Sequence, residues 1–153
     1  MTEKNKHPLS ESEAKRIVKN HKVFWTTAPQ SLNVEGEIRK VGISVVLAGT
    51  EAKDETELSG GAVSSIFDNL SALAGWAIPE ETPNVKIELR RNTNFVFYRP
   101  DEFESNVKRY ALGIRIMHAE KFDEPFDEDQ RHAYEQILEK LKIAECPKEH
   151  WKY

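Results

Sequence analysis

Two histidines and a glutamate in the second half of the chain are residue types that bind zinc or iron. His118 and Glu120 are two positions apart and share one face of a predicted strand, while Glu128 and His132 are four apart and share one face of a predicted helix. If that helix packs over the strand end, two imidazoles and a carboxylate converge in a set that these metals accept. The spacing matches no established ligand motif, and solvent-exposed positions are the favoured explanation of these residues. We keep His118, Glu120 and His132 as candidate metal ligands and predict no cofactor.

The single cysteine, Cys146, lies four residues before His150. A nucleophilic thiolate needs a nearby base or a helix N-terminus to stabilise it. Cys146 instead follows a predicted helix, whose C-terminal end carries the negative pole of the dipole and disfavours a thiolate. The 26 acidic residues give no basis for choosing an acid–base pair. The sequence therefore predicts no catalytic residue.

A glycine pair precedes the most apolar predicted helix. The segment Ser59–Ser65 is Ser-Gly-Gly-Ala-Val-Ser-Ser, and the free N–H groups of a helix N-terminus attract anions. The segment lacks the Lys-Ser/Thr ending of a phosphate-binding loop and the third glycine of a dinucleotide-binding motif. A helix start after a loop explains the same residues without a ligand. The candidate ligand-binding residues are Ser59, Gly60, Gly61 and Ser64, and a small enzyme or anion-binding domain built on them is the alternative function.

Basic and aromatic residues are interleaved between residues 90 and 115. The candidate nucleic-acid contacts are Arg90, Arg91, Arg109 and Arg115. Aromatic side chains beside arginines on a sheet face stack on the bases of single-stranded nucleic acid, and Tyr98 and Tyr110 are placed for this. The same aromatic residues are also the expected core residues of their strands, and neighbouring glutamates dilute the charge. A single-stranded nucleic-acid-associated protein is therefore the third function, and a solvated sheet face is the favoured interpretation.

Length and charge restrict the class of protein further. The 153 residues suit one domain whose core needs no disulfide or metal. The chain has 22 lysines and arginines against 26 aspartates and glutamates, and its net charge of −4 argues against DNA as a partner. No apolar run approaches the roughly 20 residues of a membrane span, and the first residues are polar. We therefore expect a cytoplasmic protein with no membrane contact.

Apolar residues at helical spacing predict three helices, over residues 10–21, 62–77 and 127–142. Ser10 and Glu13 fit a capping box, in which each side chain satisfies a backbone N–H at the start of the first helix. The second helix has the widest apolar stripe, so we expect it to be the most buried helix and to lie across a sheet. Gly75 near its end and Pro79 just after it are expected to stop this helix.

Alternation with a period of two predicts five or six strands. They are expected at residues 23–27, 31–34, 38–47, 85–90, 95–99 and 108–120. Pro29 should end the first strand because proline lacks a backbone donor, and Gly42 should mark a bulge. Residues 91–94 contain two asparagines and should form a hairpin turn between two strands.

The order of these elements predicts an α+β fold, with one mostly antiparallel sheet of about five or six strands and three helices packed mainly on one face. Residues 1–9 are expected to be a disordered N-terminal tail, residues 10–146 a single domain, and residues 147–153 a C-terminal tail. No repeat divides the chain.

The favoured function is a soluble, non-catalytic binding or interaction module that acts through protein–protein contacts or self-association. Helices on one face of a sheet leave its other face to be covered. A homo-oligomer or a protein partner is therefore expected, with Trp25, Phe95 and Phe97 as anchors, because aromatic residues concentrate at interface centres.

Overall fold

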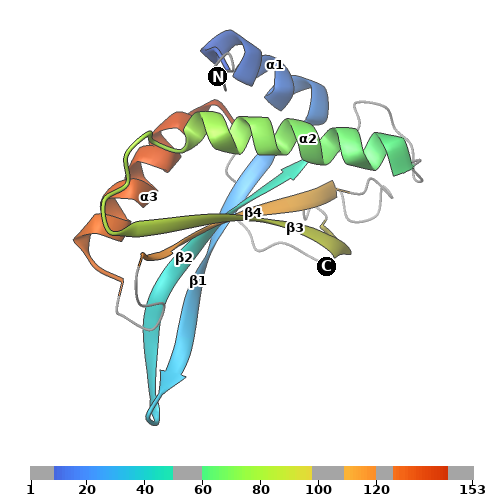
Figure 1. Cartoon of the computed structure of the whole chain (residues 1–153). Helices are drawn as coiled ribbons and strands as arrows, with labels where there is room; N and C mark the ends of the chain where they lie inside the picture. The colour runs from blue at the N-terminus through green and yellow to red at the C-terminus, as the bar shows by residue number, and fades with distance from the viewer. Residues whose placement is uncertain (1–8, 50–59, 98–108, 120–125, 145–153) are drawn as a thin grey trace, which may run out of the picture.

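The computed structural model describes residues 9–49, 60–97, 109–119 and 126–144, and within these ranges it describes the backbone alone for residues 60–64, 92–97 and 109. The elements in chain order are α1 (Glu11–His21), β1 (Phe24–Val34), β2 (Glu37–Gly49), α2 (Gly60–Ala77), β3 (Val85–Phe97), β4 (Arg109–His118), α3 (Glu128–Lys140) and the short 3-10 helix η2 (Leu141–Ile143). Figure 1 shows the three α-helices on one face of the sheet. No helix in the described ranges is long and apolar enough to cross a membrane.

The described strands form one antiparallel sheet in the order β1-β2-β4-β3. Strands β1 and β2 form a hairpin at one edge. The chain then passes through α2 to the opposite edge, and β4 returns to pair with β2 at the centre. The predicted α+β class, the antiparallel sheet and the three helices are therefore confirmed, whereas the predicted number of strands is wrong.

The described sheet has four strands rather than five or six, and one reason is Pro29. This proline does not end a strand but lies inside β1, where it pairs with Ile43. Because β1 is an edge strand, one side of its backbone has no partner strand, and a missing N–H on that side breaks no ladder bond. The predicted strands at 23–27 and 31–34 are thus one strand.

The second reason is that the hairpin predicted at residues 91–94 does not exist. Strand β3 continues through these residues, and Arg91 pairs with Leu112 of β4. The register shifts between Asn92 and Phe97, and Phe97 then pairs with Arg109. The two asparagines therefore occupy an irregular stretch of one long strand instead of a turn between two.

Gly42 lies at a β-bulge, as predicted. Gln30 pairs with Gly42 but the next residue of β1 pairs with Lys40, so Val41 is the extra residue on β2. A Cβ atom at Gly42 would lie 2.6 Å from the carbonyl oxygen of Ile116 on β4. Glycine is required here because the two central backbones approach too closely for any side chain.

The core lies between α2 and the two central strands. Pairing places Ile43, Val45 and Leu47 of β2 beside Ile116, Ile114 and Leu112 of β4 on the face covered by the helices. The opposing stripe of α2 contributes the fully buried Ile66, Leu70 and Leu73 and the nearly buried Phe67. As predicted, α2 carries the largest buried stripe among the described helices.

The two shorter helices begin at capping boxes. At α1, the predicted pair forms: the Glu13 N–H donates to Ser10 Oγ, and the Ser10 N–H donates to Glu13 Oε1. At α3, Gln130 is fully buried. Its Oε1 accepts from the Asp127 N–H at 2.8 Å and its Nε2 donates to the Asn84 carbonyl at 3.0 Å. Gln130 therefore fixes the start of α3 against the start of β3.

We predict that Leu70→Ala lowers the free energy of unfolding by about 2–5 kcal/mol, because a fully buried leucine leaves both lost transfer energy and a cavity. Urea unfolding followed by circular dichroism measures the change. The control is Ser65→Ala on the exposed side of the same helix, which should change stability by less than about 0.5 kcal/mol. A near-neutral Leu70→Ala would show that α2 does not carry the core.

Candidate functional site

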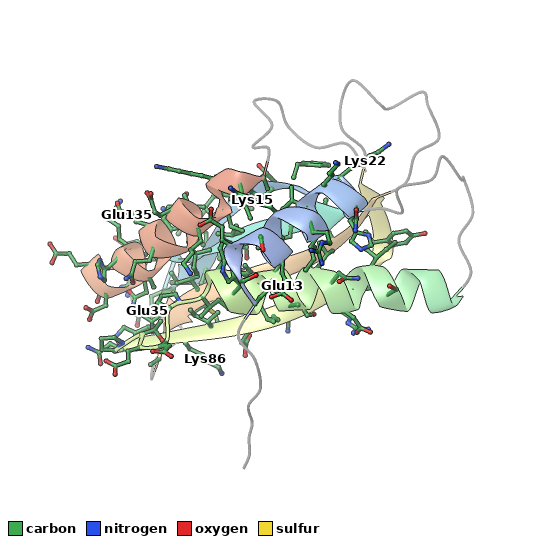
Figure 2. The ribbon with its side chains drawn as sticks, turned by 90° about the horizontal axis from the view of Figure 1, so that it is seen from above. Glu13, Lys15, Lys22, Glu35, Lys86 and Glu135 are labelled. Atoms are coloured by element: carbon green, nitrogen blue, oxygen red, sulfur yellow. The ribbon has the colours of Figure 1, made fainter. Side chains whose placement is uncertain are left out.

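A groove of about 1560 Å³ lies between the C-terminal part of α2, the connection that follows it, and α3. The residues that begin α1 complete its lining. Figure 2 shows the three helices on the upper face of the molecule, with α1 between α2 and α3. We name this feature the α2–α3 groove.

The α2 side of the groove is largely apolar. Ala72, Gly75 and Trp76 line it at the spacing of one helical face, and Ile78 and Pro79 continue it beyond the helix. Trp76 and Ile78 are half-buried against the core, so part of each side chain remains open to the groove. These residues form an apolar floor that no described element covers completely.

Gly75 has an unusual position on this floor. It lies inside α2, two residues before the helix ends at Ala77, and Pro79 follows two residues after that end, as predicted. A Cβ atom built at Gly75 would have no other group within 4 Å. Within the described structure, neither a close contact nor a positive φ angle requires glycine at this position.

The α3 side is a polar stripe. His132, Glu135, Gln136 and Glu139 line the groove at the three- and four-residue spacing of one helix face, and all four are exposed. The opposite face of α3 packs in the core through Ala133 and Ile137. Burial of that face leaves the polar stripe exposed to solvent, where it forms one border of the groove. Figure 2 labels Glu135 on α3.

Negative charge predominates among the lining residues. Four are glutamates, at positions 11, 80, 135 and 139, and the basic ones are Lys140 and His132. Glu11 pairs with Lys15 at 3.1 Å, and Glu139 pairs with Lys142 at 3.1 Å.

Lys140 has a contact of its own in the groove. Its Nζ lies 4.6 Å from the centroid of the Trp76 ring and donates to the Trp76 carbonyl at 3.4 Å. A lysine above an indole face is a favourable cation–π arrangement. The contact connects the α2 and α3 sides of the groove.

The opposite face of the sheet carries a chain of polar contacts across all four described strands. Gln30 Nε2 donates to Ser44 Oγ at 2.6 Å. Arg115 Nε and Nη2 donate to Gln30 Oε1 at 3.3 and 3.2 Å, and its Nη1 lies 3.5 Å from Glu88 Oε1. Lys86 Nζ lies 3.2 Å from Glu88 Oε2. The middle of this face is therefore polar and internally paired.

This arrangement corrects the expected aromatic anchors. Trp25 pairs with Leu47, which places it on the helix-covered face. Its Nε1 donates to the Leu141 carbonyl at 3.1 Å, so it connects β1 to η2. The side chains of Phe95 and Phe97 are outside the described part of the chain.

The structure places two of the candidate arginines on one face of the sheet and a third on the other. Arg90 and Arg115 lie on the polar face of the sheet, because their partners in the register are Gly113 and Ser44. Arg91 points to α2, where its Nη2 lies 3.3 Å from Asp68 Oδ1 and its guanidinium lies 5.1 Å from the Phe67 ring centroid. The side chain of Arg109 is not described.

The candidate stacking residues are also separated. Tyr110 packs edge-on against Phe67, with ring centroids 6.2 Å apart, on the helix-covered face. Tyr98 is outside the described residues. Nucleic-acid binding stays a prediction, because no described surface brings all of the candidate arginines and tyrosines together.

The candidate metal ligands lie on two different elements. His118 ends β4 and pairs with Val85, whereas His132 is exposed on α3 and lines the groove. The start of α3 does lie beside the start of β3, since Asn84 Nδ2 donates to Asp129 Oδ2 at 3.0 Å. Glu120 is outside the described ranges, and within those ranges no three His, Cys, Asp or Glu residues are grouped to hold a metal. The proposed ligand set stays a prediction, and Cys146 and His150 are also outside the description.

The glycine pair differs from its expected placement. Helix α2 begins at Gly60, so Gly60 and Gly61 lie in its first turn rather than before it. Ser64 also lies in α2, and Ser59 is outside the described residues. No side chain of this segment is described up to Ser64, and anion binding there stays a prediction.

Sequence reasoning missed the α2–α3 groove. Its lining comes from α1, α2, the connection after α2, and α3, and their juxtaposition depends on tertiary packing. The one local signal was Gly75, a poor helix former inside a strongly apolar helix. Comparisons with protein-family models, curated proteins and solved structures give no significant match.

We predict that Gly75→Ala raises the free energy of unfolding by about 0.5–1 kcal/mol, because alanine is the better helix former and its Cβ enters open space. Chemical denaturation measures the change. The matched control is Ala72→Gly, one turn earlier, which should lower stability by a similar amount. A loss of stability in Gly75→Ala would show that the fold itself requires this glycine.

We also predict a coupling energy of about 0.5–1 kcal/mol between Arg115 and Glu88, whose side chains are only 25% and 35% exposed. A double-mutant cycle with Arg115→Met and Glu88→Gln measures it by urea unfolding. The comparison cycle uses Lys142 and Glu139, which are 70% and 72% exposed and should couple by close to zero. Equal coupling in the two cycles would contradict a special role for the polar chain.

Proposed function

We propose that this protein is a non-catalytic binding module that holds a segment of a protein partner in the α2–α3 groove. The observation that carries this proposal is the apolar floor between two helices, which adjoins the core and which none of the described elements covers completely. Exposed apolar surface with a polar border is characteristic of protein-binding sites. The polar sheet face supports the choice of the groove, because its central side chains already satisfy one another.

The shape of the groove favours a polypeptide over a small metabolite. Its volume of about 1560 Å³ exceeds the roughly 300–1,000 Å³ typical of small-molecule pockets. Its borders are formed by the C-terminal part of α2 and by one face of α3, and a segment of chain is long enough to contact both. Grooves between helices bind partner helices through anchors spaced along one face.

A selection of peptides against the full-length protein tests the proposal. Selection from a display library of helix-forming peptides with randomised sequences should yield ligands with micromolar affinity. Gly75→Leu should weaken these ligands at least tenfold, because it places a leucine side chain in the open space above the groove floor. Loss of contact area at the centre of a small interface has effects of this size.

The matched control is Ser65→Leu, which puts the same side chain on an exposed position of α2 outside the groove. It should leave affinity within about twofold. The proposed function is contradicted if selected peptides bind the Gly75→Leu protein as tightly as the unmodified protein. Circular dichroism and urea unfolding of both variants verify that the fold is retained.

A further inference from the structure

The chemistry of the groove identifies the kind of segment that fits it. We propose that the α2–α3 groove binds an amphipathic helix of a partner protein, with small apolar residues at its centre and lysines or arginines along its flanks. This inference rests on the proposed function, and it adds the conformation and the charge of the bound segment.

The helical spacing of the residues on both sides of the groove favours a helical partner. On α3 and the 3-10 helix η2 that follows it, the lining residues run from His132 to Ile143. This run spans about 16–18 Å at 1.5 Å per residue in the α-helix and 2.0 Å in the 3-10 helix. A helix of about three turns has the same length. On α2 the floor residues Gly75 and Trp76 lie three and four positions after Ala72, on one face of the helix, and Pro79 continues the floor beyond it. The two faces therefore present ridges with the period that a third helix would match.

Gly75 favours the close approach of a partner helix. A glycine inside a helix costs stability relative to alanine, and within the described structure nothing approaches this position. The absence of a side chain nevertheless lowers the groove floor beside Trp76 and next to the small Ala72. Small residues on one helix let a second backbone approach closely. A bound helix with a small residue opposite Gly75 provides the reason for the glycine that the chain itself does not.

The charge of the groove border favours a partner with basic residues. Glu11, Glu80, Glu135 and Glu139 border the apolar floor, and Lys140 is the one lysine or arginine among the described lining residues. Glu11 and Glu139 form ion pairs with Lys15 and Lys142, which partly offset their charge, whereas Glu80 and Glu135 add to the negative border. Lys140 is also engaged with the Trp76 ring and carbonyl. Complementary charge selects partners and excludes segments of like charge. A helix with basic flanks fits this border, whereas an acidic helix is repelled.

A second copy of this chain offers no suitable helix within the described structure. The apolar face of α1 packs in its own core through Ala14, Ile17 and Val18. The core-facing stripes of α2 and α3 are likewise buried. A described helix would have to leave its own core to occupy the groove of a neighbour, so a different protein is the expected partner.

The test uses three synthetic peptides of about 14 residues, enough for the roughly three turns of the groove. They share an alanine- and leucine-rich apolar face, and the flanking positions are all lysine, all glutamine or all glutamate. Fluorescence anisotropy measures their binding to the full-length protein. The lysine peptide should bind at least tenfold more tightly than the glutamine peptide, the glutamate peptide should bind most weakly, and the lysine advantage should shrink as salt rises.

A pair of variants locates the charge effect. Glu135→Gln combined with Glu139→Gln should weaken the lysine peptide about three- to tenfold and leave the glutamine peptide within twofold, since exposed charges each contribute modestly. The matched control is Glu35→Gln combined with Glu37→Gln at the β1–β2 turn, which makes the same change in net charge away from the groove. It should leave both peptides within about twofold.

The outcomes separate this inference from the proposed function. Equal binding of the lysine and glutamine peptides, both weakened by Gly75→Leu, would overturn the charge argument and leave a protein-binding groove. Failure of all three helical peptides, with selected non-helical peptides that remain sensitive to Gly75→Leu, would overturn the helix argument alone. If neither Gly75→Leu nor the combined Glu135→Gln and Glu139→Gln variant affects binding of the lysine peptide, that peptide binds elsewhere and the inference is overturned.

Discussion

The packing of α2 against the two central strands is the contact on which the rest of this structure depends. Leu70 is fully buried, and a Cβ atom at Gly49 of β2 would lie only 3.3 Å from its Cδ2 atom. The helix therefore rests directly on the sheet backbone at this point. Burial of the α2 stripe removes several large apolar side chains from water, which is the dominant favourable term in folding.

The same contact determines where exposed surface remains. Because α2 connects β2 to β3, which lie on either side of β4, it crosses the sheet with one stripe facing inward. Helices α1 and α3 pack beside it and cover only part of its back. The part of α2 that no described element covers adjoins the polar stripe of α3, and together they form the groove. The groove is therefore a consequence of how three helices share one sheet face.

The face of the sheet opposite the helices avoids exposed apolar side chains at its centre by carrying paired polar ones. A sheet with helices on one side has an open face, and apolar residues there would need a cover. Here Arg115 at the centre contacts Gln30 on one side and Glu88 on the other, so polar groups of β1, β4 and β3 satisfy one another. This pairing reduces the requirement for an oligomer on this face. The helix side is therefore the face that has apolar surface available for a partner.

Sequence periodicity predicted the fold class because helical and strand periods were clear in most segments. The three helices lie close to their expected ranges, and the capping box of Ser10 and Glu13 is present. The strand count failed at Pro29 and at residues 91–94, where local rules indicated breaks. Both rules depend on tertiary position: proline is tolerated at a sheet edge, and asparagines are tolerated in an irregular strand. Neither an edge nor a pairing partner can be read from local sequence.

The groove shows why a candidate site was harder to predict than the fold. Its residues have no unusual types, and Glu135 or Trp76 alone indicates only a solvated helix face or a core contact. The informative signal is a conflict between local helix propensity and tertiary packing. Gly75 weakens a helix that the core requires, and the described structure offers no compensating contact. Such conflicts concentrate where a protein meets something outside itself. Gly42 provides the contrast, because the close approach of Ile116 fully explains that glycine within the chain. Of the two glycines, Gly75 is therefore the one that points to a partner.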